Sequence, residues 1–254
     1  MSSRADRRRK ERGGTAPPRR RDPMIGVYIA LGVVLVLVFA GFGIWSWIAN
    51  SRTSSYMAFV LSTPTPGPKA SSKPIQLQDG KGLGKRVFPT PNPRGGFFAD
   101  TPQGGQNQPV DGIPCQAAEQ AVLHVHTHLA ILNHGVLIQV PPYVGFAGNS
   151  SLPQGGCLYW IHTHDGSGII HLEAGSAISP NGGNYTIGNF FDVWGQPLSR
   201  TRIGPFTGNV TAYLNGYPYN GDLATIPLRA HQQVVLEIGQ PVVPPPYYAF
   251  PLND

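Results

Sequence analysis

A run of 26 residues without a charged side chain, Met24–Ala49, constrains this chain more than any other feature. A helix rises 1.5 Å per residue, so about 20 apolar residues cross the roughly 30 Å hydrocarbon core of a membrane. Trp45 and Trp47, near the end of the run, are typical of a membrane interface. The run therefore predicts one transmembrane anchor helix over residues 24–49. A cleaved signal peptide is the alternative, but its apolar region is normally about 7–15 residues.

Positive charge is concentrated before this run. Residues 1–23 hold nine Lys and Arg against three Asp and Glu, an excess that equals the net charge of the whole chain, +6. Because cationic flanks stay in the cytoplasm, we predict a basic cytoplasmic tail over 1–23 and an extracytoplasmic position for everything after Asn50.

The charge distribution also bears on partners. Residues 111–254 carry three arginines against eight acidic residues. A nucleic-acid surface concentrates cations on the folded domain, so no nucleic-acid partner is expected. The expected partners are the membrane and a membrane or envelope protein complex.

Two further segments follow the anchor. Residues 50–110 contain nine prolines and two Gly doublets, and such a segment cannot bury enough surface to offset the entropy of ordering. We predict an extracytoplasmic linker there. From residue 111 onward, short alternating runs are broken by turn residues, which predicts a mostly β ectodomain over 111–254. Its expected architecture is a compact antiparallel sheet or sandwich with one or two short helices.

Local patterns place the elements of this domain. Asn215-Gly216 and Asn133-His134-Gly135 are typical of hairpin turns. Thr186 is a candidate N-cap for a helix over 187–194 that ends at Gly195, and a helical turn is expected over 116–121. The predicted strands are 122–132, 136–140, 158–164, 169–173, 210–214 and 233–238.

Six histidines fall in two short motifs. The first is HVHTH, which contains His124, His126 and His128. Residues two apart in a strand share a face, so these three imidazoles project side by side.

The second motif is WIHTHDGSGIIHLE, residues 160–173, in which residues 165–168 have the composition of a hairpin turn. A turn centred between Gly166 and Ser167 pairs His162 with His171 and Trp160 with Glu173. Directly opposite residues of an antiparallel pair share a face. The pairing therefore predicts one face that carries His162, His164, His171 and Glu173.

Imidazole is a common ligand of zinc and copper, and two His from one strand can meet a third from its partner. Glu173 or Asp165 could complete the site or orient an imidazole. Packing HVHTH against the hairpin brings six imidazoles together, enough for one crowded site or two separate ones. The structural alternative is a polar sheet face whose histidines bond to water. His134, in a predicted turn, and His231, at a strand start, are expected to be structural.

Cys115 and Cys157 each precede a histidine strand. Outside the cytoplasm a disulfide is the expected state, and closing a loop of this length stabilises a fold by about 3–4 kcal/mol. A thiolate ligand for copper is the alternative.

The HxHxH motif combined with HTHDxSGxIHxE resembles uncharacterised bacterial single-pass membrane-anchored proteins. The resemblance spans most of residues 111–254 and implies no activity. Three functions remain open on the sequence. They are a tethered domain that binds zinc or copper, a metalloenzyme with an open metal position and Glu173 or Asp165 as general base, and an interaction module without metal.

Overall fold

The structure is a computed structural model that describes residues 24–65, 107–148 and 156–250. The chain divides into two compact units, Met1–Asn50 and Ser51–Asp254. The predicted basic tail over 1–23 lies outside the described residues, as do residues 66–106 of the predicted linker.

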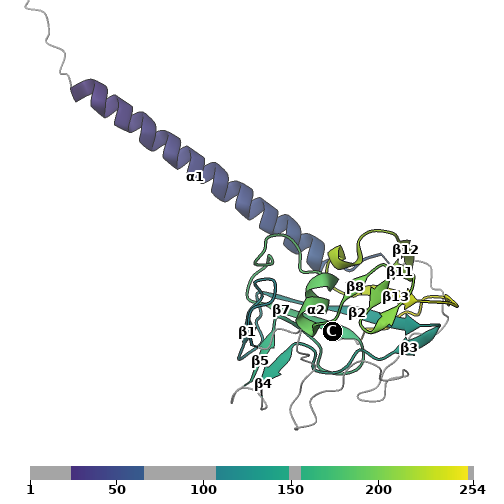
Figure 1. Ribbon diagram of the computed structural model, residues 1–254. Helices are drawn as coiled ribbons and strands as arrows, with labels where there is room; N and C mark the ends of the chain where they lie inside the picture. The colour runs from purple at the N-terminus through teal and green to yellow at the C-terminus, as the bar shows by residue number, and fades with distance from the viewer. Residues whose placement is uncertain (1–23, 66–106, 149–155, 251–254) are drawn as a thin grey trace, which may run out of the picture. The chain divides into compact units, whose positions relative to one another are not determined.

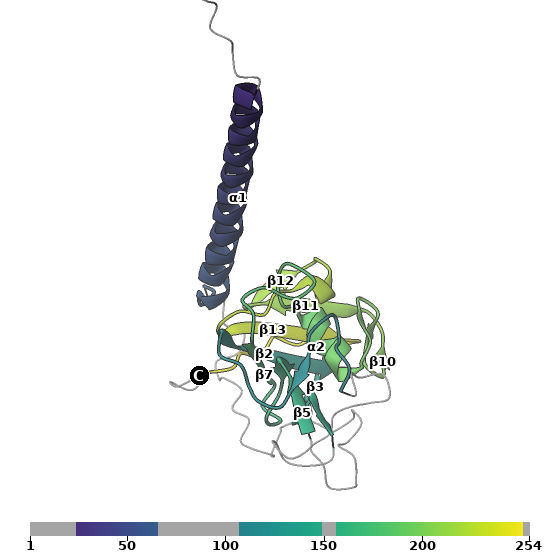
Figure 2. The same ribbon diagram turned by 90° about the vertical axis from the view of Figure 1, so that its left-hand side faces the viewer.

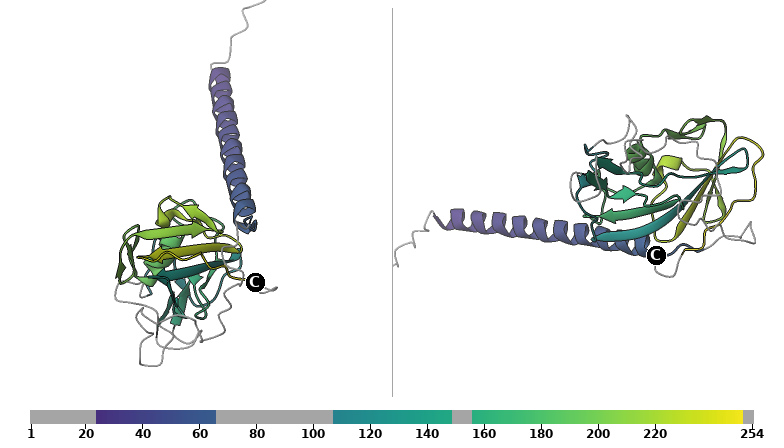
Figure 3. Two further views of the ribbon diagram at one scale, coloured as in Figure 1. Left: turned by 90° about the vertical axis from the view of Figure 1, so that its right-hand side faces the viewer. Right: turned by 90° about the horizontal axis from the view of Figure 1, so that it is seen from below.

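The first element is the helix α1 (Met24–Leu61), which is long and apolar enough to cross a membrane by length and composition. Figure 3 shows it as one uninterrupted coil. The predicted anchor over 24–49 lies within it. The helix continues past Asn50, however, so residues 50–61 of the predicted linker are helical. This extension follows from composition, because no proline interrupts the chain until Pro64.

The last turns of α1 belong to the second unit and contact its β structure. Val60 is completely buried, and its carbonyl accepts a hydrogen bond from Ala230 N at 2.9 Å. Arg229 donates from Nε to Phe59 O and from Nη2 to Ser62 O, both at 3.1 Å. The last carbonyls of a helix lack partners within the helix. Arg229 and Ala230 therefore supply donors that the helix end itself lacks.

The main sheet has seven strands. They are β2 (Leu123–Asn133), β3 (Val136–Ile138), β6 (Ile161–His162), β7 (Ile169–Ala174), β11 (Val210–Leu214), β12 (Tyr217–Tyr219) and β13 (Gln232–Ile238). Their order is β12-β11-β13-β2-β7-β6, with β3 paired to β2 beyond the end of β7 (Figure 1). The predicted mostly β class is confirmed. The sheet is mixed rather than antiparallel, because β13 runs parallel to β2. Parallel neighbours require a long crossover, which the intervening chain supplies.

Smaller elements surround this sheet and give the domain a sandwich-like architecture. They are the sheet β1 (Cys115–Gln116), β5 (Gly156–Tyr159) and β4 (Phe146–Gly148), the sheet β10 (Phe206–Thr207), β9 (Arg202–Ile203) and β8 (Leu198–Ser199), the helix α2 (Ile187–Trp194) and the 3-10 helix η2 (Leu223–Thr225). Residues 116–121 are not helical, which corrects the expected helical turn. Gln116 is instead held in β1 by its pairing with Leu158.

The helix α2 begins and ends where its sequence predicts. The Thr186 side chain accepts from Asn189 N at 3.2 Å, and Gly195 adopts the left-handed conformation, with φ of 69°. Both are ordinary helix boundaries, because a hydroxyl satisfies an open N–H and glycine tolerates positive φ. Phe190 and Trp194 project from α2 into the core.

The two faces of β2 have different environments. Leu123 and Val125 lie in the main core, the cluster to which α2 also contributes its apolar residues (Figure 2). The opposite face carries the histidines of HVHTH near the start of the strand. Farther along, that face is apolar, where Ala130 and Leu132 pack with Val235. The period of two thus separates an apolar core face from a histidine face.

Both predicted hairpin turns are confirmed. Asn215 and Gly216 have φ of 54° and 87° between the paired strands β11 and β12. His134 and Gly135 have φ of 50° and 74° between β2 and β3. Two successive positive φ values match the twist of a two-residue hairpin, and Asn and Gly tolerate them best.

Candidate metal centre

Three adjacent strands carry the candidate centre, with β7 between β2 and β6. His126 on β2 and His162 on β6 both lie opposite His171 on β7. The predicted register of the hairpin, His162 against His171, is therefore confirmed. Three imidazoles lie in one row across the sheet, on the face opposite the apolar core.

The predicted strand over 158–164 is divided into β5 and β6, and His164 lies beyond the ladder. The chain leaves the ladder because Asp165 Oδ1 accepts from Ser167 N at 2.8 Å, which forms a tight side-chain turn. His164 still approaches its neighbour, with 3.2 Å between His164 Nε2 and His162 Nε2. Asp165 belongs to neither group of potential ligands described below.

Two overlapping groups of side chains have the geometry to hold a metal ion. The first consists of His124, His126, His171 and Glu173, and the second of His162, His164, His171 and Glu173. Within each group the ligand atoms lie within 4.8 Å of one another. The Nε2 atoms of His124 and His126 are 3.1 Å apart, close to the 3.2 Å separation in the other pair.

Glu173 lies between the two histidine pairs. Its Oε1 is 3.2 Å from His124 Nε2 and 3.5 Å from His171 Nδ1, whereas its Oε2 is 3.8 Å from His162 Nε2. The side chain is 6% exposed, and within the described residues its ion-pair contacts are all with imidazoles. A buried carboxylate surrounded by lone-pair donors is a suitable environment for a cation.

Electrostatics favour the ligand form of these groups. Burial lowers the pKa of His126 to about 4 and that of His162 to about 3, and it also lowers the pKa of His164. Burial alone would raise the pKa of Glu173, but hydrogen bonding to His171 and the charges of neighbouring histidines lower that pKa to about 2. At neutral pH His126, His162 and His164 are therefore neutral and Glu173 is ionised, the forms that bind metal.

A backbone contact orients one of these imidazoles. His162 is completely buried, and its Nδ1 lies 2.8 Å from Tyr159 O. A carbonyl only accepts, so Nδ1 carries the proton and the lone pair is on Nε2, which faces Glu173 and His164. This arrangement is typical of ligand histidines whose second nitrogen is fixed by a carbonyl.

The hydrogen bonding of the buried polar atoms also fits a bound metal ion. Glu173 Oε2 and His171 Nδ1 are buried, and within the described part of the chain neither makes a well-formed hydrogen bond, since their ion-pair contacts with His162 Nε2 and Glu173 Oε1 are 3.8 and 3.5 Å long. Buried polar atoms without a well-formed hydrogen bond are rare in folded proteins, and an ion is one of the groups that explains them. Imidazole nitrogen and carboxylate oxygen are the donors that zinc and copper(II) accept.

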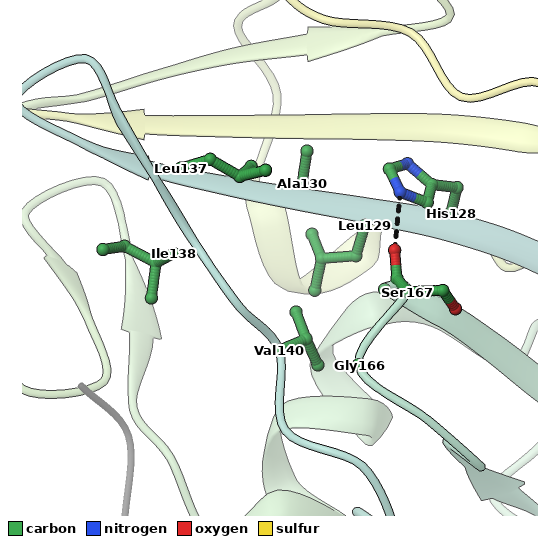
Figure 4. Close-up of a pocket in the computed structure, with 9 residues that line it drawn as sticks. His128, Leu129, Ala130, Leu137, Ile138, Val140, Gly166 and Ser167 are labelled. Carbon is green, nitrogen blue, oxygen red and sulfur yellow. Dashed lines mark hydrogen bonds between the residues drawn. The ribbon is translucent and has the colours of Figure 1, made fainter. Parts of the chain in front are cut away.

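His128, predicted with the other histidines, is not in either group. It is buried, and its Nε2 lies 3.0 Å from Ser167 O (Figure 4). Its ring stacks on that of Tyr248, with 4.4 Å between the ring centres. Figure 4 shows it beside a small cavity with apolar side chains from β2 and β3. Because it is two residues beyond His126, it lies on the same face of β2, but Tyr248 of the C-terminal segment covers it.

Glu119 is a candidate that the sequence analysis did not identify. Its Oε1 is 3.3 Å from His164 Nε2, and burial together with the charge of Glu173 raises its pKa. Glu119 lies between β1 and β2 without a motif of its own. The only sequence signal is its place four residues after Cys115, whose partner Cys157 precedes the second histidine motif.

The remaining candidates lie elsewhere. Cys115 and Cys157 form a disulfide, as predicted, so neither is a thiolate ligand. His134 is in its turn with Nδ1 2.7 Å from Gln240 O, and His231 contacts the ring of Phe250.

A comparison of the chain with protein-family models, curated proteins and solved structures finds no match in any of the three. The geometry of the site is therefore the basis for its function.

Proposed function

We propose that this chain is a single-pass membrane protein whose extracytoplasmic domain binds transition-metal ions, zinc or copper, through its histidine cluster. The main support for the proposal is that two separate histidine pairs meet at one shared histidine and one shared carboxylate. Two His-x-His pairs, one on β2 and one at the end of β6, which is not its neighbour, face the same His171 and Glu173. The alternative, a polar sheet face whose histidines bond to water, does not require the histidine pairs to meet or a carboxylate to be buried between them.

The location follows from three features. The apolar helix has the length of a membrane span, nine cations precede it, and the domain contains a disulfide. Cationic flanks stay in the cytoplasm, and disulfides persist in oxidising compartments. Together they support a cytoplasmic N-terminus and an extracytoplasmic C-terminal domain at the cell membrane.

The donor chemistry narrows the choice of metal. Five imidazoles and a carboxylate suit zinc or copper(II), whereas copper(I) prefers thiolate and thioether sulfur. Both cysteines are in the disulfide. The three methionines of the chain are Met1, Met24 and Met57, none of them in the segments that carry the ligands. We therefore favour zinc or copper(II).

One observation favours a second function, metal-assisted hydrolysis. The side chains of His124 and Glu119 are each 53% exposed, so one side of the centre is open to solvent. A bound zinc ion supplies an acidified water. In this second function Glu119 would act as a general base and not as a ligand, because its carboxylate lies at the open edge beside His164.

The test is the metal content of the full-length chain purified in detergent, stripped with a chelator and exposed to Zn²⁺ or Cu²⁺. We expect tight, stoichiometric binding that His171→Ala weakens at least tenfold, because His171 is shared by both groups. His134→Asn is the matched control, since His134 lies in the turn between β2 and β3, outside the site, and Asn tolerates its positive φ. A wild-type chain that binds neither ion would overturn the proposal and leave an interaction module as the remaining function.

A further inference from the structure

We propose that the centre holds two metal ions, one at each His-x-His pair, with the Glu173 carboxylate bridging them. This inference rests on the proposed function and adds a stoichiometry and a bridging residue to it. It follows from the order of the strands, the spacing within each pair, the orientation of Glu173 and the number of donors.

Strand order separates the two histidine pairs. His124 and His126 are on β2, His162 is the last residue of β6 with His164 just beyond it, and β7 lies between β2 and β6. Adjacent strands are about 4.8 Å apart, so the backbones that carry the two pairs are about 10 Å apart. One ion at 2.0–2.1 Å from every imidazole would need all side chains to meet at a point over β7. With two ions, one on each side of β7, each histidine pair needs to reach only its own ion.

The spacing within each pair is that of two ligands on one ion. Two donors bound at 2.0–2.1 Å with a tetrahedral angle are about 3.3 Å apart. The Nε2 atoms of His124 and His126 are 3.1 Å apart, and those of His162 and His164 are 3.2 Å apart. Each pair alone therefore forms half of a tetrahedral site.

Glu173 presents one oxygen to each pair. Oε1 lies 3.2 Å from His124 Nε2, and Oε2 lies 3.8 Å from His162 Nε2. The Glu173 side chain is more than nine-tenths buried, and Oε2 makes no hydrogen bond within the described residues. A carboxylate held in this way between two sets of nitrogen donors is placed to bind one ion with each oxygen.

The donors suffice for two four-coordinate ions. The first set is His124, His126, His171 through Nδ1, and Glu173 Oε1. The second set is His162, His164 and Glu173 Oε2. Glu119, whose Oε1 lies 3.3 Å from His164 Nε2, would supply its fourth donor because His171 binds the first ion. The second set depends on Glu119, which is half-exposed and outside the sheet. We therefore expect the first ion to bind at the three-histidine set and the second to bind more weakly.

The experiment is a zinc titration of the full-length chain in detergent after chelation, with bound zinc counted after gel filtration. We expect two ions per chain for the wild type. His124→Ala and His164→Ala should each retain one, because both side chains are partly exposed and their loss spares the fold. Glu119→Gln should weaken the binding of only the second zinc ion, by about tenfold or more. His134→Asn should still bind two.

The bridge is tested by loading the wild-type chain with Cu²⁺ in place of zinc. Two ions that share Glu173 should give a spin-coupled electron paramagnetic resonance spectrum, with intensity below that expected from the copper content. Glu173→Gln should lose the coupling. Two magnetically independent coppers would overturn the bridge. One zinc ion per chain would overturn the two-ion centre but leave the proposed function intact, whereas no binding would overturn both.

Discussion

Glu173 lies directly opposite His124 across the ladder between β2 and β7, with 3.2 Å between Oε1 and Nε2. This pairing joins the two histidine motifs, which are about forty residues apart in the sequence. It also places a buried negative charge at the centre of the imidazoles. The charge of this side chain should therefore control metal affinity more than any single histidine.

Glu173→Gln keeps the size of the side chain and removes its charge. We expect metal affinity to fall by about 100-fold, at the upper end of the effects seen when groups around a metal are removed. The secondary structure should be unchanged in circular dichroism, because the backbone pairing of residue 173 persists. Competition with a coloured chelator measures the affinity. An affinity within threefold of the wild type would contradict a role for this carboxylate.

His128→Asn should change pH dependence without changing metal stoichiometry. Burial lowers the pKa of His128 to about 4, although a hydrogen bond to Ser167 O opposes the shift. The unfolded chain, with a pKa near 6.5, then binds the proton more readily than the folded one. The free energy of unfolding of the metal-free protein should therefore fall as pH falls from 6.5 to 4.

Each such group contributes a slope of up to about 1.4 kcal/mol per pH unit within that window. His128→Asn should reduce the slope of the wild-type chain by that amount, measured by urea unfolding between pH 6.5 and 4.5. His134→Asn provides the comparison. Equal slopes in the wild type and His128→Asn would show that His128 is not buried as a neutral imidazole.

The disulfide between Cys115 and Cys157 joins the segments that carry Glu119 and His162. Replacing both cysteines with serine should lower the free energy of unfolding by about 3–4 kcal/mol, because a closed loop of this length restricts the unfolded chain. Denaturant unfolding of the metal-free protein measures the effect. A loss below about 1 kcal/mol would show that the cross-link does not constrain this part of the fold.

Arg229 should hold the end of α1 to the β domain. Besides its bonds to Phe59 O and Ser62 O, its guanidinium lies 4.0 Å from the centre of the Phe59 ring. Arg229→Ala should increase hydrogen exchange at residues 56–62 at least tenfold, because the helix end loses these donors. Arg202→Ala is the matched control, since Arg202 bonds locally to Gly204 O. Unchanged exchange at the helix end would contradict this role.

Local sequence patterns predicted the hairpin register of the site, because a Gly-rich turn and a period of two determine that His162 faces His171. They could not predict that β2 pairs with β7, since this contact joins distant segments. That His128 lies outside both groups of potential ligands also depends on tertiary structure, because its contacts Tyr248 and Ser167 are distant in the sequence.

The parts of the fold that the sequence did not predict share a cause. The parallel pairing of β13 with β2 and the approach of Glu119 to His164 both depend on how long connections return to the sheet. No local pattern encodes such a return. The helix α2 is the opposite case, because Thr186 and Gly195 define its ends within ten residues.

X-ray absorption at the zinc edge of the full-length, zinc-loaded chain would observe the metal centre itself. We expect a first shell of nitrogen and oxygen at about 2.0–2.1 Å, with the outer-shell scattering of two or three imidazoles per zinc. His171→Ala should lower that imidazole number. A first shell of oxygen alone, with no imidazole scattering, would contradict the metal centre described here.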